Sequence, residues 1–470
     1  MFKIKSKIPD FEPDVPTVAG SVKGRFAKFS WNSRNSDLYM TYSHTRSALF
    51  VRYVLIFLIT VFSVTCLPAS GLAVKFIIKP MANVSGRLDT NFFKTERGER
   101  EVYTYLFAPG IQLGVEMTKL EVLFNYTLEA YFYDDKSSVP VGEKPADDLD
   151  YVGHLLALNV KYRPFRRLTV GVSDSFYRTR YQTAYDRLSD TTDLYRYDIN
   201  HLTPMIFYDF ENKFSTGLRY RWTEISYVDS GNSDSTEHRL IYNLIYDPNR
   251  TTTLDLECQL WTMDYDFGSS DYTSDQFKLI VQKRYKYFAF DVGAGYHMRS
   301  YDQSGWSDED TFAYKVSILG QNPPPPEGRR YLGNIFLRPR SEFYLAAERN
   351  FNNLGSLGTA HRFTADAGHI FLEKIHVRVK GWYQMTDYVR SYGLTPGGVL
   401  KKRSDDIYNV SASVGYLFTE RLELTLVGGI ENRDSNLANA DYNNKFINLR
   451  LDFNFDFKSR GGFTEESLYY

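Results

Sequence analysis

Side chains able to do acid–base, nucleophilic or metal chemistry are few and scattered along this sequence. The nearest group of histidines is His361, His369 and His376, and no acidic residue is patterned beside them. His369 and His376 flank an expected turn, so they could approach each other. Gly-x-Ser-x-Gly and His-Glu-x-x-His motifs are absent, and Cys258 falls at an apolar position of an alternating stretch. The sequence therefore predicts no enzyme, no metal site and no cofactor.

Charged side chains that alternate with apolar ones are the second candidate for function. If the apolar positions face lipid, the charged positions face the inside of a closed sheet, where they could set a pore's preference for ions and solutes. A simpler interpretation is that they form the wet face of a barrel and pair with one another. Both interpretations predict a hydrated interior. The predicted pore-lining residues are Arg219, Arg221, Asp255, Glu257, Arg378, Lys380, Arg450, Asp452 and Asp456.

The elements that must position these side chains are β-strands. Near the end of the chain, apolar residues occupy every second position from 447 to 457, with polar residues between them. A period of two places the apolar side chains on one face of a strand and cannot form an amphipathic helix. Similar alternation covers residues 122–132, 218–223, 254–260, 375–380 and 408–418.

Short and long connections alternate along the chain between these stretches. Short ones lie, for example, at 163–166 and 247–250, and long polar ones at 134–149 and 390–405. This order predicts an up-and-down meander with short turns at one rim and long loops at the other. The expected strands number about eighteen, within roughly 16–20. They lie near 81–94, 102–116, 119–133, 149–162, 167–181, 194–211, 214–228, 236–247, 251–266, 273–284, 287–301, 309–320, 331–350, 359–372, 374–389, 404–418, 421–433 and 444–457.

The sequence leaves one turn of the meander unassigned. Pro323 to Pro326 cannot donate hydrogen bonds to a sheet, and Pro339 interrupts an otherwise regular stretch. The sequence does not decide which of them marks the short turn.

Composition excludes several classes of protein. The 470 residues include 16% aromatic and 24% charged residues, with a net charge of -1. These values fit neither a disordered chain nor a polytopic helical membrane protein. Without a basic excess, nucleic acid is not an expected partner. Two cysteines, Cys66 and Cys258, exclude a disulfide scaffold and a multi-cysteine zinc site.

A single apolar run, residues 53–64, indicates export. It follows Arg46 and Arg52 and precedes small residues at Gly71 and Ala73, which predicts a signal peptide cleaved after Ala73. The alternative is an uncleaved anchor helix, which needs roughly 20 apolar residues. The expected organisation is a leader or mis-assigned start at 1–39, a signal peptide at 40–73, a barrel domain at 74–457 and a tail at 458–470.

A soluble β-sandwich would also alternate, so the barrel needs a separate argument. The alternating theme runs without a linker, and its strands are longer than the five to six residues typical of globular sheets. Backbone amides in lipid have no water to bond, so a spanning sheet must close on itself. The predicted fold is therefore an all-β, transmembrane, antiparallel up-and-down β-barrel in a bacterial outer membrane.

The chain from about 80 to 457 resembles the outer-membrane β-barrel porins of the β-barrel porin 2 type, which are associated with exopolysaccharide loci. The residues that carry the resemblance lie at 77–80, 86–91, 108–113 and 451–457. Tyr162-Arg-Pro164 and Leu337-Arg-Pro339 resemble the family's short periplasmic turns. The resemblance implies an outer-membrane location, barrel-assembly machinery as a partner and a link to polysaccharide export components.

The function predicted from these observations is an aqueous, porin-like channel for small polar solutes. The alternative is a non-conducting structural or assembly barrel of a polysaccharide secretion system. The long loops are expected outside the cell, near lipopolysaccharide. The acidic loop 134–149, with Asp134, Asp135, Glu143, Asp147 and Asp148, is expected to bind divalent cations weakly.

Overall fold

The computed structural model describes residues 75–140, 142–181, 188, 195–210, 213–228, 233–266, 271–303, 307–322, 340–352, 357–419 and 421–454. All of them belong to one compact unit, Ala73–Tyr470. The predicted leader, signal peptide and tail, and the prolines 323–326 and 339, lie outside the described residues. Among the described residues, no helix is long and apolar enough to cross a membrane.

The described residues form eighteen strands and one short 3-10 helix, η1 (Ala146–Leu149). The strands are β1 (Lys75–Asp89), β2 (Val102–Glu116), β3 (Leu120–Asp135), β4 (Tyr151–Phe165), β5 (Leu168–Thr179), β6 (Tyr197–Asp209), β7 (Phe214–Tyr227), β8 (Ser235–Asn249), β9 (Thr252–Tyr265), β10 (Tyr272–Arg284), β11 (Phe288–Tyr301), β12 (Glu309–Asn322), β13 (Ser341–Phe351), β14 (Gly358–Phe371), β15 (Ile375–Leu394), β16 (Leu400–Thr419), β17 (Leu422–Ser435) and β18 (Tyr442–Asn454).

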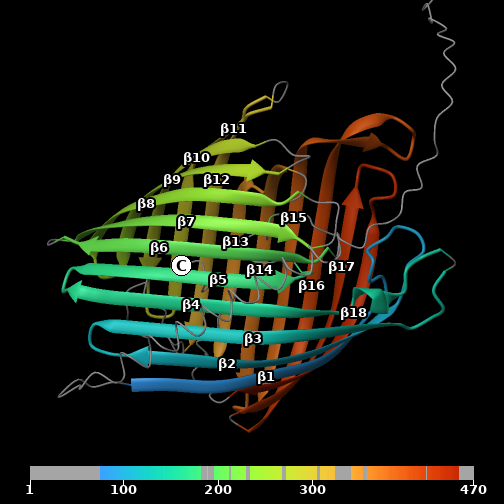
Figure 1. Cartoon of the computed structure of the whole chain (residues 1–470), viewed down its shortest axis with the longest axis horizontal. Coiled ribbons are helices and arrows are strands. Elements are labelled where there is room, and N and C mark those ends of the chain that lie inside the picture. Colours follow the sequence, from blue (N-terminus) through green and yellow to red (C-terminus); the bar gives the residue numbers. More distant parts are fainter. Residues whose placement is uncertain are drawn as a thin grey trace, which may run out of the picture. The chain divides into compact units, whose positions relative to one another are not determined.

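These strands form one closed antiparallel sheet. Each strand pairs with its neighbours in the chain, and β1 also pairs with β18 from Met81↔Asn454 to Asp89↔Phe446. The strands on the near side cross those on the far side at a steep angle, as tilted strands of a barrel do (Figure 1). The predicted all-β, up-and-down barrel is confirmed, and so is the expected strand number.

The two rims differ as the spacing predicted. Turns as short as Arg166–Arg167 and Arg250–Thr251 close one rim, whereas the β1–β2 and β3–β4 connections at the other span 90–101 and 136–150. Lys75 pairs with Glu116 beside a short turn, and Asn454 pairs with Met81, so both ends of the sheet lie toward the short-turn rim.

Two expected turns are displaced by irregular strand ends. Pro164 and Pro248 lie within β4 and β8, each where the pairing register shifts just before the turn. A bulge leaves one residue unpaired, which suits a residue that lacks an N–H. The side chains of Lys119 and Lys213, from the preceding turns, donate to the carbonyl oxygens of Pro164 and Pro248 at 3.3 and 2.7 Å.

Two predicted parts of the meander are displaced. β1 runs from Lys75 to Asp89 rather than from 81 to 94. Pro80 lies in a stretch paired only with β2, where an edge tolerates the missing N–H. The expected long loop at 390–405 is instead a hairpin of β15 and β16, paired up to Leu394↔Leu400. Its glycines and lysines suggested a loop, but pairing continues across a register shift between Asp387 and Tyr392.

The barrel's two faces differ in chemistry. Apolar side chains at every second position are exposed on the outside, for example Leu449 at 51%, whereas most inward positions are polar. Exposed aromatic side chains gather toward both ends of the strands, as in the girdles of membrane barrels. Those toward the short turns include Phe76, Phe165, Phe210, Tyr285 and Phe418; those toward the long loops include Tyr105, Phe132, Tyr296 and Phe312.

Candidate functional site

Eight of the nine predicted pore-lining residues lie on the inner face of the barrel. They alternate with exposed outward residues such as Leu218, Leu256, Val379 and Leu451. Their positions are Arg219 and Arg221 on β7, Asp255 and Glu257 on β9, Arg378 and Lys380 on β15, and Arg450 and Asp452 on β18. Asp456 lies outside the described residues. Their role in lining a pore stays a prediction.

Three of the eight meet in one network on β7–β10. Arg219 donates to Asn243 Oδ1 at 2.9 Å and lies 3.7 Å from a carboxylate oxygen of Glu257. Lys278 approaches Glu257 from the other side at 3.4 Å, and Asn243 donates to Asp255 at 3.0 Å. Glu257 is therefore shared by two cations, one from β7 and one from β10.

Arg221 belongs to an adjoining network centred on Glu237, whose side chain is completely buried. Arg221 lies 3.0 Å and Arg239 2.6 Å from its carboxylate oxygens. Gln259 accepts from Arg239 at 3.0 Å and donates to Glu257 at 2.7 Å, which joins the two networks. A buried carboxylate requires such pairing, because an isolated charge away from water is costly.

Toward the long-loop rim, this network passes into a stack of aromatic rings and arginines. Arg239 lies over Trp261 at 3.9 Å, and Arg299 over Tyr272 at 4.2 Å and over Phe351 at 4.7 Å. Such contacts stabilise guanidinium groups that are buried, as those of Arg239 and Arg299 are. The stack places two arginines on this wall of the lumen, toward the long-loop rim.

Several members of this wall were not predicted from the sequence. They are Glu237, Arg239, Lys278 and Arg299. Glu237 and Arg239 alternate with the exposed Leu240 and Tyr242 on β8, so the period of two could have found them.

The other side of the lumen carries separate ion pairs. Arg378 lies 2.6 Å from Asp366 and 3.0 Å from Glu342. Arg450 donates to Asp452 at 2.7 Å, and Asn83 of β1 donates to the same carboxylate at 2.8 Å. Asp452 therefore links β18 to β1 at the seam that closes the barrel. The exposed Lys380 has no ion pair among the described residues.

One described contact crosses the lumen. Gln384 of β15 is buried and donates to the backbone oxygen of Leu188, in the β5–β6 connection, at 3.0 Å. Leu188 precedes β6, and β15 lies nine strands from β6 in either direction around the closed ring, on the opposite wall. This contact narrows the interior.

The start of the same connection is also anchored inside the barrel. Tyr181 follows β5, and its hydroxyl lies 3.1 Å from that of Tyr133, while Tyr197 donates to its backbone oxygen at 2.8 Å. Burial raises the pKa of Tyr181 to about 12, so this side chain stays neutral at physiological pH.

The structure does not bring His369, His376 and Cys258 together. His369 lies 2.7 Å from Ser341 Oγ, whereas His376 lies 3.4 Å from Glu423, so the two diverge across their turn. Glu423 is an acidic partner that the sequence pattern did not reveal, because it comes from β17. Cys258 lies on the outward face, paired with Tyr242 and Phe277. Within the described part of the chain, no cluster of three or more His, Cys, Asp or Glu could hold a metal.

The acidic loop does not keep all its carboxylates free for cations. Arg100 lies 2.6 Å from Asp135 and 3.2 Å from Glu143, and the N–H of Ala146 donates to Asp135. Asp135 is thus a structural acceptor that holds η1 against β3, which weakens the divalent-cation hypothesis for this loop.

Comparisons with known proteins give structural likeness only. No family model and no curated protein matches the chain. Solved structures that match include Pseudomonas aeruginosa OpdK with vanillate, at 11% identity, covering 80% of this chain and 99% of that one, TM-score 0.43. P. aeruginosa OccK7 (OpdD) matches at 12% identity, with 81% and 99% covered and a TM-score of 0.44. Acinetobacter baumannii OccAB2 matches at 10%, with 82% and 98% covered and a TM-score of 0.45.

Location follows from the barrel's own surfaces. Its backbone groups are paired around a closed ring, its outer face is apolar between aromatic girdles, and its inner face is polar. Antiparallel barrels with these three properties span outer membranes. The protein is an outer-membrane β-barrel.

Proposed function

We propose that this barrel is a porin-like aqueous channel for small polar solutes in a bacterial outer membrane. The observation that carries the proposal is the inner face of β7–β10, where Arg219, Arg221, Glu257 and Lys278 form one charged wall. Charged groups persist in a barrel interior because water or a polar solute solvates what the pairs leave unsatisfied.

The arrangement of charges favours small solutes that carry polar groups of both kinds. Cations and carboxylates alternate along the wall at separations below 4 Å, so the local field changes sign over a few ångströms. On the other side, Lys380 presents an exposed ammonium group to the lumen. An eighteen-strand barrel has room for such a path.

We assign no reaction and no cofactor to this protein. His376 faces the lumen near the short-turn rim and lies 3.4 Å from Glu423. Expected partners are outer-membrane lipid, lipopolysaccharide and barrel-assembly machinery.

A non-conducting barrel that assists polysaccharide export is the second candidate. The observation that favours it is the contact of Gln384 with Leu188, because a residue placed against the opposite wall reduces the open section of the lumen. The link to exopolysaccharide export components rests on the sequence resemblance alone.

Planar-bilayer recording separates the two candidates. The purified protein should give stable open steps, and Lys380→Glu should change their ion selectivity. Reproducible absence of steps from barrels that are folded, as judged by heat-modifiable gel migration, would contradict the channel and favour the non-conducting role.

A further inference from the structure

The outer face of β12–β16 contains an open groove of about 810 Å³. Small side chains make its floor, since Ala347, Ala365, Ala367 and Gly381 occupy outward positions on three consecutive strands. Ala365 pairs with both Leu345 and Gly381, and Ala367 pairs with Val379. The sheet is therefore thin here, between taller side chains.

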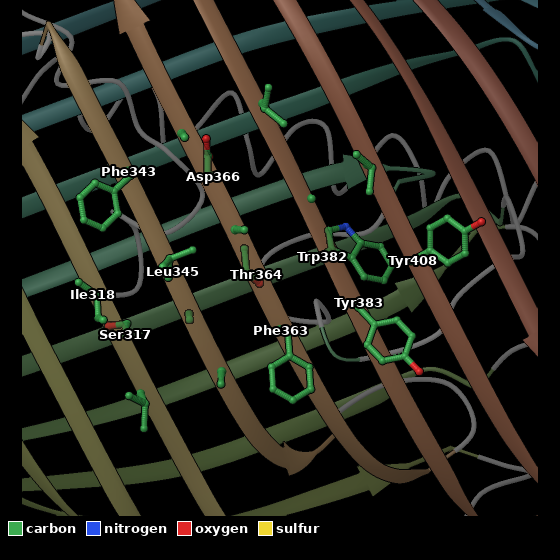
Figure 2. A pocket seen from close by; sticks show the side chains of 18 residues that line it. Ser317, Ile318, Phe343, Leu345, Phe363, Thr364, Asp366, Trp382, Tyr383 and Tyr408 are labelled. Atoms are coloured by element: carbon green, nitrogen blue, oxygen red, sulfur yellow. The ribbon is translucent and has the colours of Figure 1, made fainter.

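Large side chains make the walls of this groove. The rings of Phe343, Phe363 and Tyr383 stand around it, one on each of β13, β14 and β15 (Figure 2). Phe343 leans over Gly320, where an added Cβ would come within 2.1 Å of its ring. Because Gly320 has no side chain, the Phe343 ring packs against the sheet there and forms the wall of the groove on that side.

The same strands become polar just beyond the groove, toward the long-loop rim. Asp406 and Asp434 are paired in register on β16 and β17, both outward and exposed, and Asp406 bonds the Tyr383 side chain. Ser404 donates to Asp387 at 2.9 Å, and the exposed Lys402 follows on the same face. An apolar groove thus leads into a patch with three carboxylates and one ammonium group.

We propose that this groove is a lipid site that holds acyl chains of lipopolysaccharide, with the lipid's phosphates at the patch of Asp406, Asp434 and Lys402. An apolar groove that leads to charged groups fits an amphiphile aligned with the strands. A second copy of the barrel would present a convex surface, which leaves a hollow unfilled. The site rests on the proposed topology, because the long-loop rim must face the outer leaflet.

The charge of the patch selects the headgroup. Its excess of carboxylates repels a bare phosphate, but divalent cations bridge carboxylates and phosphates through shared oxygens. Asp406 and Asp434 supply too few oxygens for the six to eight that Ca²⁺ takes, so lipid phosphates would complete the shell. Lys402 pairs with phosphate directly.

Filling the groove tests the proposal. Ala365→Phe would occupy the floor, and Ala130→Phe on β3, an outward position beside the exposed Phe107 and Val152, is the matched control. Rough lipopolysaccharide bound per barrel is measured by native mass spectrometry in Mg²⁺. The expected result is a several-fold loss for Ala365→Phe and none for Ala130→Phe.

The headgroup patch has its own variant, which leaves the side-chain volumes around the groove unchanged. Asp406→Asn combined with Asp434→Asn should make lipopolysaccharide binding weaker and nearly insensitive to EDTA. Unchanged binding in both variants would overturn the proposal. Loss of dimers without loss of lipid would overturn it in favour of a second copy of the barrel. Equal retention of phosphatidylethanolamine in EDTA would overturn it in favour of a phospholipid.

These outcomes are independent of the proposed channel. Folding is checked by heat-modifiable migration, and conductance is recorded on the same samples. A change in lipopolysaccharide binding with intact conductance bears only on the proposed lipid site. Absent conductance with normal lipid binding bears only on the proposed channel.

Discussion

Two aspartates on opposite faces of the barrel show how the two surfaces differ. Asp452 faces the lumen, where Arg450 and Asn83 both donate to its carboxylate. Asp174 faces outward between Leu158 and Leu202, and one of its carboxylate oxygens has no hydrogen-bond partner among the described residues. An aspartate is stabilised by hydrogen bonds on the inner face and left in an apolar environment on the outer face. The face therefore decides whether an aspartate stabilises or destabilises the barrel.

The largest expected effect comes from placing a charge on the outer face. Leu449→Arg should destabilise the folded barrel by about 2–4 kcal/mol, because Leu449 pairs with Leu426 well inside the apolar band. Leu451 lies closer to the short-turn rim, so Leu451→Arg should cost less, toward about 1 kcal/mol. Urea-dependent folding into vesicles measures both. Asp452→Asn is the control, and it should barely change the free energy of unfolding.

Removing a charge from the outer face should have the opposite sign. Asp174→Leu should stabilise the barrel by on the order of 1 kcal/mol, because an acidic side chain on the lipid face is destabilising, although less so than Arg or Lys. Asp452→Leu should destabilise it, since Arg450 and Asn83 would lose their acceptor. The same folding titration applies, and equal effects of both substitutions would remove the distinction between the faces.

A smaller effect is expected on ion selectivity. Glu257→Gln would leave Arg219 and Lys278 without their shared carboxylate, so the lumen should become more anion-selective. The reversal potential across a salt gradient should shift accordingly. Asp148→Asn, on the exposed connection before β4, makes the same charge change outside the lumen. A shift as large for Asp148→Asn would argue against a pore past Glu257.

Much of the fold was predictable because apolar and polar side chains must alternate along a strand that has lipid on one face and water on the other. β2 was predicted at its observed residues, 102–116. The β15–β16 hairpin was not, because glycines and charges at 390–405 suggest a loop, and only pairing with a neighbouring strand extends it. Pro164 and Pro248 suggested turns for a similar reason, although each occupies an irregular strand end.

The sequence predicted which side chains face the lumen, but it did not predict which of them form ion pairs. A period of two places Arg219 and Glu257 inside, yet their contact depends on registers across β7, β8 and β9, which turn lengths set. The Glu423 partner of His376 comes from a strand distant in sequence. The contact between Gln384 and Leu188 spans 196 residues, and no local pattern indicates it.

Cysteine accessibility along β18 tests most directly the central claim that one face meets lipid and the other water. In a chain with Cys66→Ala and Cys258→Ala, single cysteines replace Leu451 or Asp452, and the barrel in vesicles is exposed to a water-soluble maleimide. Leu451→Cys should stay unlabelled, while Asp452→Cys should react through the lumen. Labelling at 451 with protection at 452 would contradict the assignment of the two faces.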